Sequence, residues 1–129
     1  MRFLSVDDVL AIHERIEEMG DTEGGMLSYG ALESAVHRMT HGPFPHIGAL
    51  IERAALLLRG VAQDHPFVDG NKRTAFEACY TMLKENGVQL TFDAEQTTEF
   101  MVAVAMGEHD IDSITTWLQE RANPNTEDE

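Results

Sequence analysis

The sequence predicts an all-α domain of about six helices. Apolar residues recur at helical spacing along most of the 129 residues, and glycines or prolines separate the periodic segments. Residues 47–63 are apolar on nearly every face, which predicts a helix buried at the centre of the domain. The chain is long enough for a single hydrophobic core. We therefore expect one domain over residues 1–122, followed by a polar, acidic tail over residues 123–129 that frays.

Two amphipathic helices are expected before the central one. Ser5 and Asp8 form a candidate capping box, and an apolar stripe runs over residues 6–19 until a glycine ends the helix. A polar, glycine-rich loop follows, and a second apolar stripe over residues 32–39 predicts the next helix. Two prolines within residues 41–46 end that helix, because they cannot both sit in a helix interior.

Three further helices are expected after the central one. The first runs over about residues 71–85 and ends at an Asn-Gly pair, and a short extended link over residues 88–92 follows it. Asp93 caps the second helix, which continues to about residue 106. Apolar residues at helical spacing over 111–118 mark the last one.

The charge and the cysteine content narrow the class of protein. The chain carries 23 acidic and 9 basic residues, for a net charge of −14, and a field of that sign repels nucleic acids. No apolar run approaches the ~20 residues of a membrane span, and the N-terminus does not resemble a signal peptide. The single cysteine, Cys79, cannot form an internal disulfide. We therefore expect a cytoplasmic protein with no direct nucleic-acid or membrane partner. Scarce lysine among so many acids is typical of proteins from halophiles and also of ordinary acidic cytosolic proteins.

Residues 65–73, His-Pro-Phe-Val-Asp-Gly-Asn-Lys-Arg, carry the chemistry of the chain. A tight turn at Gly70 that enters a helix at Asn71 leaves backbone N–H groups pointing outward, and the helix dipole makes such an end a site for anions. Lys72 adds a mobile point charge and Arg73 a fork of donors, both suited to phosphate. The stretch therefore predicts a phosphate site.

Two other side chains of the same stretch suit catalysis. Asp69 offers an oxygen ligand for Mg²⁺, which commonly reaches nucleotide sites through one or two carboxylates. An imidazole such as that of His65 accepts a proton from an attacking hydroxyl near neutral pH. Phe67 is expected to be a buried anchor without a chemical role. Each of these residues is common in structural loops, but their combination within nine positions indicates nucleotide chemistry.

This stretch resembles the signature of the Fic/Doc family, His-x-Phe-x-Asp/Glu-Gly-Asn-Gly-Arg. It is most similar to the Doc branch, in which lysine occupies the position of Lys72. Segments on both sides of the motif, from Leu4 to about Leu118, are similar to the Doc pattern as well. The resemblance implies a helical bundle with a short flap, which would fall near residues 41–48.

The resemblance also implies an activity. Fic proteins transfer AMP from ATP to a protein hydroxyl, whereas Doc toxins transfer the γ-phosphate to a threonine of elongation factor Tu and arrest translation. By this resemblance His65 is the general base, Asp69 binds Mg²⁺, and the phosphates of ATP are held by Gly70, Asn71, Lys72 and Arg73. A Phd-type antitoxin, whose C-terminal segment folds onto the toxin, is the implied regulator.

Two positions separate phosphate transfer from AMP transfer. Lys72 fills space that a glycine leaves open in Fic proteins, which favours a reversed nucleotide with its γ-phosphorus facing His65. Phe76 stands where the Fic signature has a second arginine. Both departures favour the kinase. The alternatives are an AMP transferase that tolerates Lys72 and a non-catalytic interaction module that kept the loop as structure.

Two further patterns carry less weight. His37 and His41 lie one helical turn apart with His46 nearby, an arrangement compatible with zinc, but no other ligand type accompanies them. Residues 81–86 formally fit the pattern of Fic inhibitory helices. Because they lie inside the helix that follows the motif, we interpret that match as coincidence.

Overall fold

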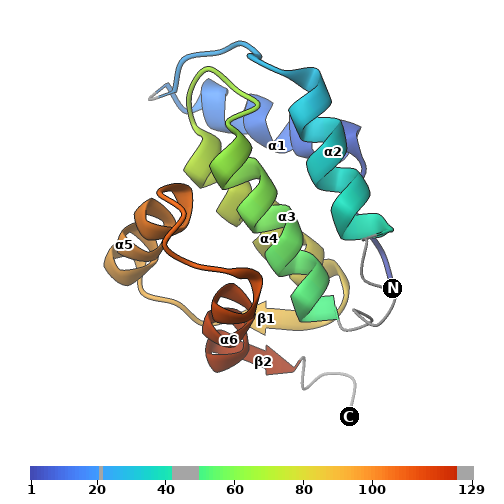
Figure 1. Ribbon diagram of the computed structural model, residues 1–129, viewed down its shortest axis with the longest axis vertical. Coiled ribbons are helices and arrows are strands. Elements are labelled where there is room, and N and C mark those ends of the chain that lie inside the picture. Colours follow the sequence, from blue (N-terminus) through green and yellow to red (C-terminus); the bar gives the residue numbers. More distant parts are fainter. Residues whose placement is uncertain (21, 42–49, 125–129) are drawn as a thin grey trace.

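The computed structural model of the chain describes residues 1–20, 22–41 and 50–124, and it confirms the all-α prediction. This part of the chain forms six helices and a small sheet of two strands (Figure 1). The helices are α1 (Val6–Glu18), α2 (Tyr29–Thr40), α3 (Leu50–Asp64), α4 (Asn71–Glu85), α5 (Ala94–Ala105) and α6 (Ile111–Arg121), and the strands are β1 (Val88–Leu90) and β2 (Ala122–Pro124).

Helix α3 is the centre of the bundle, as its all-round apolar sequence predicts. It contacts α2, α4, α5 and α6, and its residues 54–58 are buried without interruption. Figure 1 shows α3 and α4 running side by side through the middle, with α1 and α2 at one end and α5 and α6 at the other. The connection between α3 and α4 is therefore anchored at both ends by the best-packed helices of the domain.

Side-chain caps set several helix starts. The predicted capping box of α1 is present, since Asp8 N–H donates to Ser5 Oγ and Ser5 N–H donates to the Asp8 carboxylate. The carboxylate of Asp93 accepts from the N–H of Gln96 at the start of α5, and Asp110 caps α6 in the same way. These bonds satisfy N–H groups that the helix itself leaves unpaired.

The C-terminal segment departs from the expectation of a frayed tail beginning at residue 123. Residues Ala122–Pro124 form β2, which pairs antiparallel with β1, and Gln89 lies opposite Asn123. The Asn123 side chain adds a bond from Nδ2 to Thr91 Oγ1 of 2.6 Å. The extended link predicted after α4 is present, and it serves as the partner of this strand. A sequence window cannot reveal such a pairing, because the two strands are joined only by the fold.

Two expectations concern other parts of the chain. The flap expected near residues 41–48 lies almost entirely outside the described residues. Among the helices of the described residues, none has the length and hydropathy needed to cross a bilayer.

Candidate active site

The predicted motif forms the corner between α3 and α4. Helix α3 ends at Asp64, as expected from the proline at position 66, which disfavours helical backbone in the residue before it. His65 takes a left-handed conformation with φ of 46°, which is uncommon for a residue with a side chain. The His65 side chain is exposed. The sharp corner thus presents the candidate base at the surface.

Two buried side chains, those of Phe67 and Asn71, hold the corner in its conformation. Phe67 is buried, as predicted, and its ring stacks on the imidazole of His13 from α1 at 3.8 Å between centroids. Asn71 Nδ2 donates to the Phe67 carbonyl at 2.9 Å, and Phe67 N–H donates to Asn71 Oδ1 at 3.0 Å. The Asn71 amide is therefore engaged within the loop, and the group that Asn71 offers to an anion is its backbone N–H.

The predicted anion site falls at the start of α4. Gly70 precedes the helix with a φ of 77°, and a Cβ there would lie 2.7 Å from Cγ2 of Thr22. Both the conformation and the contact require glycine at this position. The N–H groups of residues 71–73 occupy the first helical turn, where no helical carbonyl can accept from them. They point with the positive end of the helix dipole toward any bound anion.

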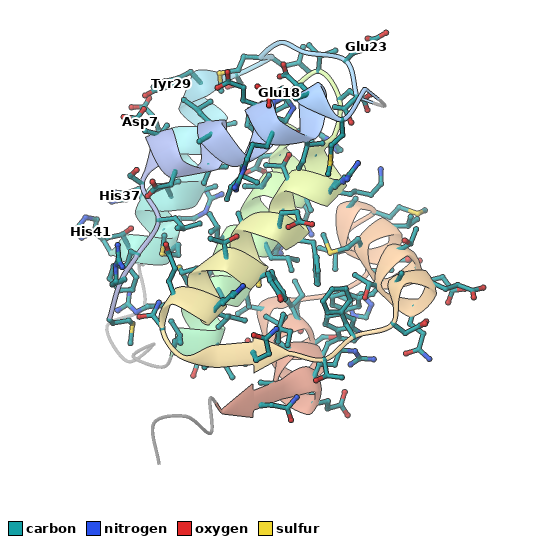
Figure 2. All side chains as sticks on the ribbon, turned by 180° about the vertical axis from the view of Figure 1, so that it is seen from behind. Asp7, Glu18, Glu23, Tyr29, His37 and His41 are labelled. Carbon is teal, nitrogen blue, oxygen red and sulfur yellow. The ribbon has the colours of Figure 1, made fainter. Side chains whose placement is uncertain are left out.

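Asp69 lies at the edge of this site with an exposed side chain. Its carboxylate accepts from the N–H of Gly70 at 2.9 Å and from the N–H of Glu23 at 3.2 Å. Figure 2 labels Glu23 on the loop after α1, at the end of the molecule where the motif lies. The two bonds hold the carboxylate in place while leaving oxygen lone pairs for a cation.

The two cations of the motif are exposed, and within the described part of the chain neither forms an ion pair with a carboxylate. Arg73 Nη2 lies 2.9 Å from Sδ of Met19 on α1, which is a weak acceptor. In a chain with 23 acidic residues, two neighbouring cations that have no carboxylate partner in the described ranges are available to a phosphate.

A cleft of about 460 Å³ joins these groups to an apolar wall. Residues 69–73 line it, and Phe76 and Glu77 continue the lining along α4. Phe92 and the first turns of α5 also line it, and Phe76 meets Phe92 edge to face at 4.9 Å between centroids. A cationic end beside an aromatic wall suits a nucleotide, whose phosphates and base need these two environments.

The structure thus gathers five of the six predicted site residues in one cleft: Asp69, Gly70, Asn71, Lys72 and Arg73. His65 lies at the other end of the same corner and does not line this cleft. The position where the Fic signature has a second arginine is filled by Phe76, which is buried and lines the cleft.

The sequence interpretation did not predict that α1 and the loop after it support the corner. His13 was expected only as part of the apolar stripe of the first helix, yet its ring contacts both Phe67 and the Asp69 carbonyl. The loop after α1 pairs with the motif as well: Leu27 and Ser28 donate to the Pro66 carbonyl, and Val68 donates to that of Gly25. A histidine on an apolar stripe with a glutamate four residues later was the available signal.

Two other groups lie away from the site. Burial raises the pKa of the Cys79 thiol to about 12, so the thiol stays protonated and unreactive near neutral pH. His37 and His41 project from the outer side of α2 (Figure 2), with 4.8 Å between ring centroids. No cluster of three potential metal ligands occurs among the residues that the structure describes, which leave out His46.

Comparison with known proteins agrees with the motif and its setting. A model of the Fic/DOC family matches residues 3–83. The chain is 42% identical over 97 residues to "Toxin Doc" of Mycolicibacterium smegmatis, covering 70% of this chain and 72% of that protein. It is 32% identical over 121 residues to "Protein kinase doc" of Escherichia phage P1, covering 92% of this chain and 94% of that protein. The family resemblance inferred from residues 65–73 is thereby confirmed: the chain belongs to the Fic/Doc family, in its Doc branch.

Proposed function

We propose that this chain is a toxin of the Doc type that transfers the γ-phosphate of ATP to a hydroxyl of a target protein. The observation that carries this proposal is the lining of the cleft. Lys72 and Phe76 both border the space beside the α4 N-terminus, where a Fic AMP transferase would have a glycine and an arginine. The name of the phage P1 relative, a protein kinase, supports the same direction of transfer.

In the proposed reaction the target hydroxyl attacks the γ-phosphorus. A bond forms between the hydroxyl oxygen and that phosphorus, the bond from phosphorus to the β–γ bridging oxygen breaks, and ADP leaves with the electron pair. The hydroxyl proton passes to a ring nitrogen of His65. Because His65 is exposed at a fixed corner, the hydroxyl of a protein substrate has access to it.

Most of the catalysis in this proposal comes from charge and position. Phosphoryl transfer depends chiefly on aligning the reactants and on stabilising the charge of the phosphates. The N–H groups at the start of α4, with Lys72 and Arg73, are the donors that do this here. An His65→Ala change should therefore lower turnover much more than ATP affinity.

The residues present fit a magnesium ion that arrives with the nucleotide. Mg²⁺ in nucleotide sites takes one or two carboxylates and completes its shell with phosphate and water oxygens. Asp69 is the one carboxylate of the motif corner, exposed at the edge of the phosphate site. When bound there, Mg²⁺ would neutralise phosphate charge.

The proposed partners follow from the same family relationship. The target is a threonine of a translation elongation factor, so that the reaction arrests translation in the cytoplasm. The regulator is a Phd-type antitoxin. Residues 81–86, which formally match an inhibitory helix, lie in the last turns of α4 and at its C-cap and form no separate element. This placement supports control by another chain.

The test is a paired label-transfer assay with Mg²⁺ and elongation factor. One reaction receives ATP labelled at the γ-phosphate and the other ATP labelled at the α-phosphate, at low and at high salt. We expect label from the γ position only, and none with His65→Ala. Label from the α position would identify an AMP transferase instead. Absence of both labels, together with no binding of Mg·ATP, would indicate the non-catalytic module.

A further inference from the structure

His13 connects α1 directly to the motif, 56 residues away in the sequence. Its side chain is buried, with 3% of the residue exposed. Nε2 lies 2.9 Å from the backbone oxygen of Asp69, and Nδ1 lies 2.8 Å from the carboxylate of Glu17. The ring also stacks on Phe67, with 6° between the ring planes. Both ring nitrogens of this buried histidine therefore have polar partners, and one of those partners belongs to the motif.

The bond from His13 restrains one particular peptide unit. The Asp69 carbonyl and the Gly70 N–H belong to the same peptide plane, so fixing the carbonyl also fixes the N–H. That N–H donates to the Asp69 carboxylate at 2.9 Å. Gly70, with its φ of 77°, lacks the Cβ that elsewhere limits rotation of a peptide. The contact from His13 supplies the missing restraint.

Glu17 and Gly24 hold the histidine in turn. The Glu17 carboxylate bonds Nδ1, and a Cβ added at Gly24 would lie 2.8 Å from Glu17 Oε2. The glycine therefore leaves the space that the carboxylate occupies. A series of contacts thus leads from Gly24 through Glu17 and His13 to Asp69.

We propose that His13 is a positioning residue, which fixes the Asp69–Gly70 peptide and thereby aims the Asp69 carboxylate at the metal–phosphate site. The part that concerns metal rests on the proposed function. The part that concerns the peptide stands without it. The competing explanation is that the histidine is needed only for its packing on Phe67.

Two substitutions separate the hydrogen bond from the packing. His13→Phe keeps an aromatic ring against Phe67 and removes both ring nitrogens. His13→Gln removes the ring and keeps an amide N–H that can reach the Asp69 carbonyl. The matched control is His109→Phe, since the ring of His109 also packs on a phenylalanine, Phe100, and bonds a neighbour, Ser113, and both of these residues are outside the motif.

The first measurement is the Mg²⁺ concentration needed for half-maximal ATP binding. Loss of the group that orients a metal ligand commonly lowers metal affinity by about tenfold or more. We expect His13→Phe to raise the Mg²⁺ requirement by that factor, His13→Gln to recover part of it, and His109→Phe to leave it unchanged. In an Asp69→Asn background, His13→Phe should add nothing, because the two act through one group. An unchanged Mg²⁺ requirement, no recovery with Gln, or a full effect without Asp69 would overturn the proposal.

The second measurement needs no nucleotide. Amide hydrogen exchange of the apo protein reports directly on the Gly70 N–H and the Val68 N–H, which donates to Gly25. We expect both to lose protection in His13→Phe, while the N–H of Thr91 beside the sheet keeps it. Unchanged protection at Gly70 would refute the restraint itself. If the wild type failed to bind Mg·ATP while His13→Phe still lost protection at Gly70, the proposed function would fall and the positioning of the peptide would stand.

Discussion

Phe67 and Asn71 exchange two hydrogen bonds across the motif corner, one from the Asn71 amide to the Phe67 carbonyl and one from the Phe67 N–H to Asn71 Oδ1. Both residues are buried, so no water can replace these partners. The family signature contains phenylalanine and asparagine four positions apart, and the structure gives this spacing a physical reason. The pair fixes the corner on which the proposed phosphate site is built.

Replacing Asn71 by alanine should therefore destabilise the protein and not merely weaken anion binding. Two buried backbone groups of Phe67 would lose their partners, at a cost of about 2–4 kcal/mol in the free energy of unfolding. Urea unfolding measures this. The control is Lys72→Ala, one residue further on an exposed side, which should change stability by less than ~0.5 kcal/mol. Equal stability of the two variants would contradict the structural role of Asn71.

Gly70 and Gly20 offer a matched comparison of strain and contact. Both have positive φ, 77° at Gly70 and 92° at Gly20. A Cβ at Gly20 meets none of the described residues within 4 Å, whereas one at Gly70 meets Thr22 Cγ2. Gly20→Ala should lower the free energy of unfolding by ~1–2 kcal/mol, which is the cost of a side chain in the left-handed conformation. Gly70→Ala should lower it by clearly more. Because the excess comes from one methyl group, Thr22→Ser should recover part of it in the Gly70→Ala background. Thermal melting of the four proteins tests this, and identical losses at the two glycines would argue against the contact.

The conformation of His65 predicts a conflict between stability and activity. A side chain at φ of 46° costs ~1–2 kcal/mol relative to glycine in the left-handed region. His65→Ala keeps that strain and His65→Gly removes it. Removing the strain raises the free energy of unfolding, but the flexibility of glycine in the unfolded chain offsets part of that increase. His65→Gly should therefore be more stable than His65→Ala by ~1 kcal/mol. Both should be inactive in the γ-label assay. A less stable glycine variant would show that the left-handed conformation is not a source of strain.

The sequence predicted the elements whose signals are local. The capping box at Ser5, the end of α3 before a proline and the glycine turn into α4 each depend on neighbours within a few residues, and each is present. The motif likewise occupies nine consecutive positions, so its gathering into one corner required no knowledge of the fold.

The features that were missed depend on residues distant in the sequence. The pairing of β1 with β2, the contact of His13 with Asp69 and the support of residues 66–68 by the loop after α1 all join separate segments. For His13 the local signal is a glutamate four residues later, and that signal does not reveal which loop the histidine bonds. The apolar wall of the cleft was missed for the same reason, because Phe92 approaches Phe76 only when α5 packs beside α4.

Cys79 predicts how stability changes with pH. Burial raises its pKa from 9.0 to about 12 in the folded protein. Above pH 9.0 the unfolded chain loses this proton while the folded chain keeps it, so the unfolded state binds fewer protons. The contribution of Cys79 to the free energy of unfolding is therefore complete below pH 9.0. It falls as the pH rises toward 12, by up to ~1.4 kcal/mol per pH unit. Urea unfolding should show a steeper alkaline decline for the wild type than for Cys79→Ala. Parallel curves would mean that the thiol ionises alike in both states.

Exchanging the two residues that favour transfer of the γ-phosphate should change which phosphate of ATP is transferred. Replacing Lys72 by glycine opens space beside the α4 N-terminus, and Phe76→Arg places a guanidinium on the wall of the same cleft. We expect the double variant to lose γ-label transfer by a factor of about 100 or more, since it loses the Lys72 ammonium that would stabilise the transferred phosphate, and to gain transfer of α-label. The control is Lys84→Gly, the only other lysine, in the last turn of α4. It should keep γ-label transfer, because it does not line the cleft. If the double variant kept γ-transfer, the direction of the nucleotide would have to be set by groups other than Lys72 and Phe76.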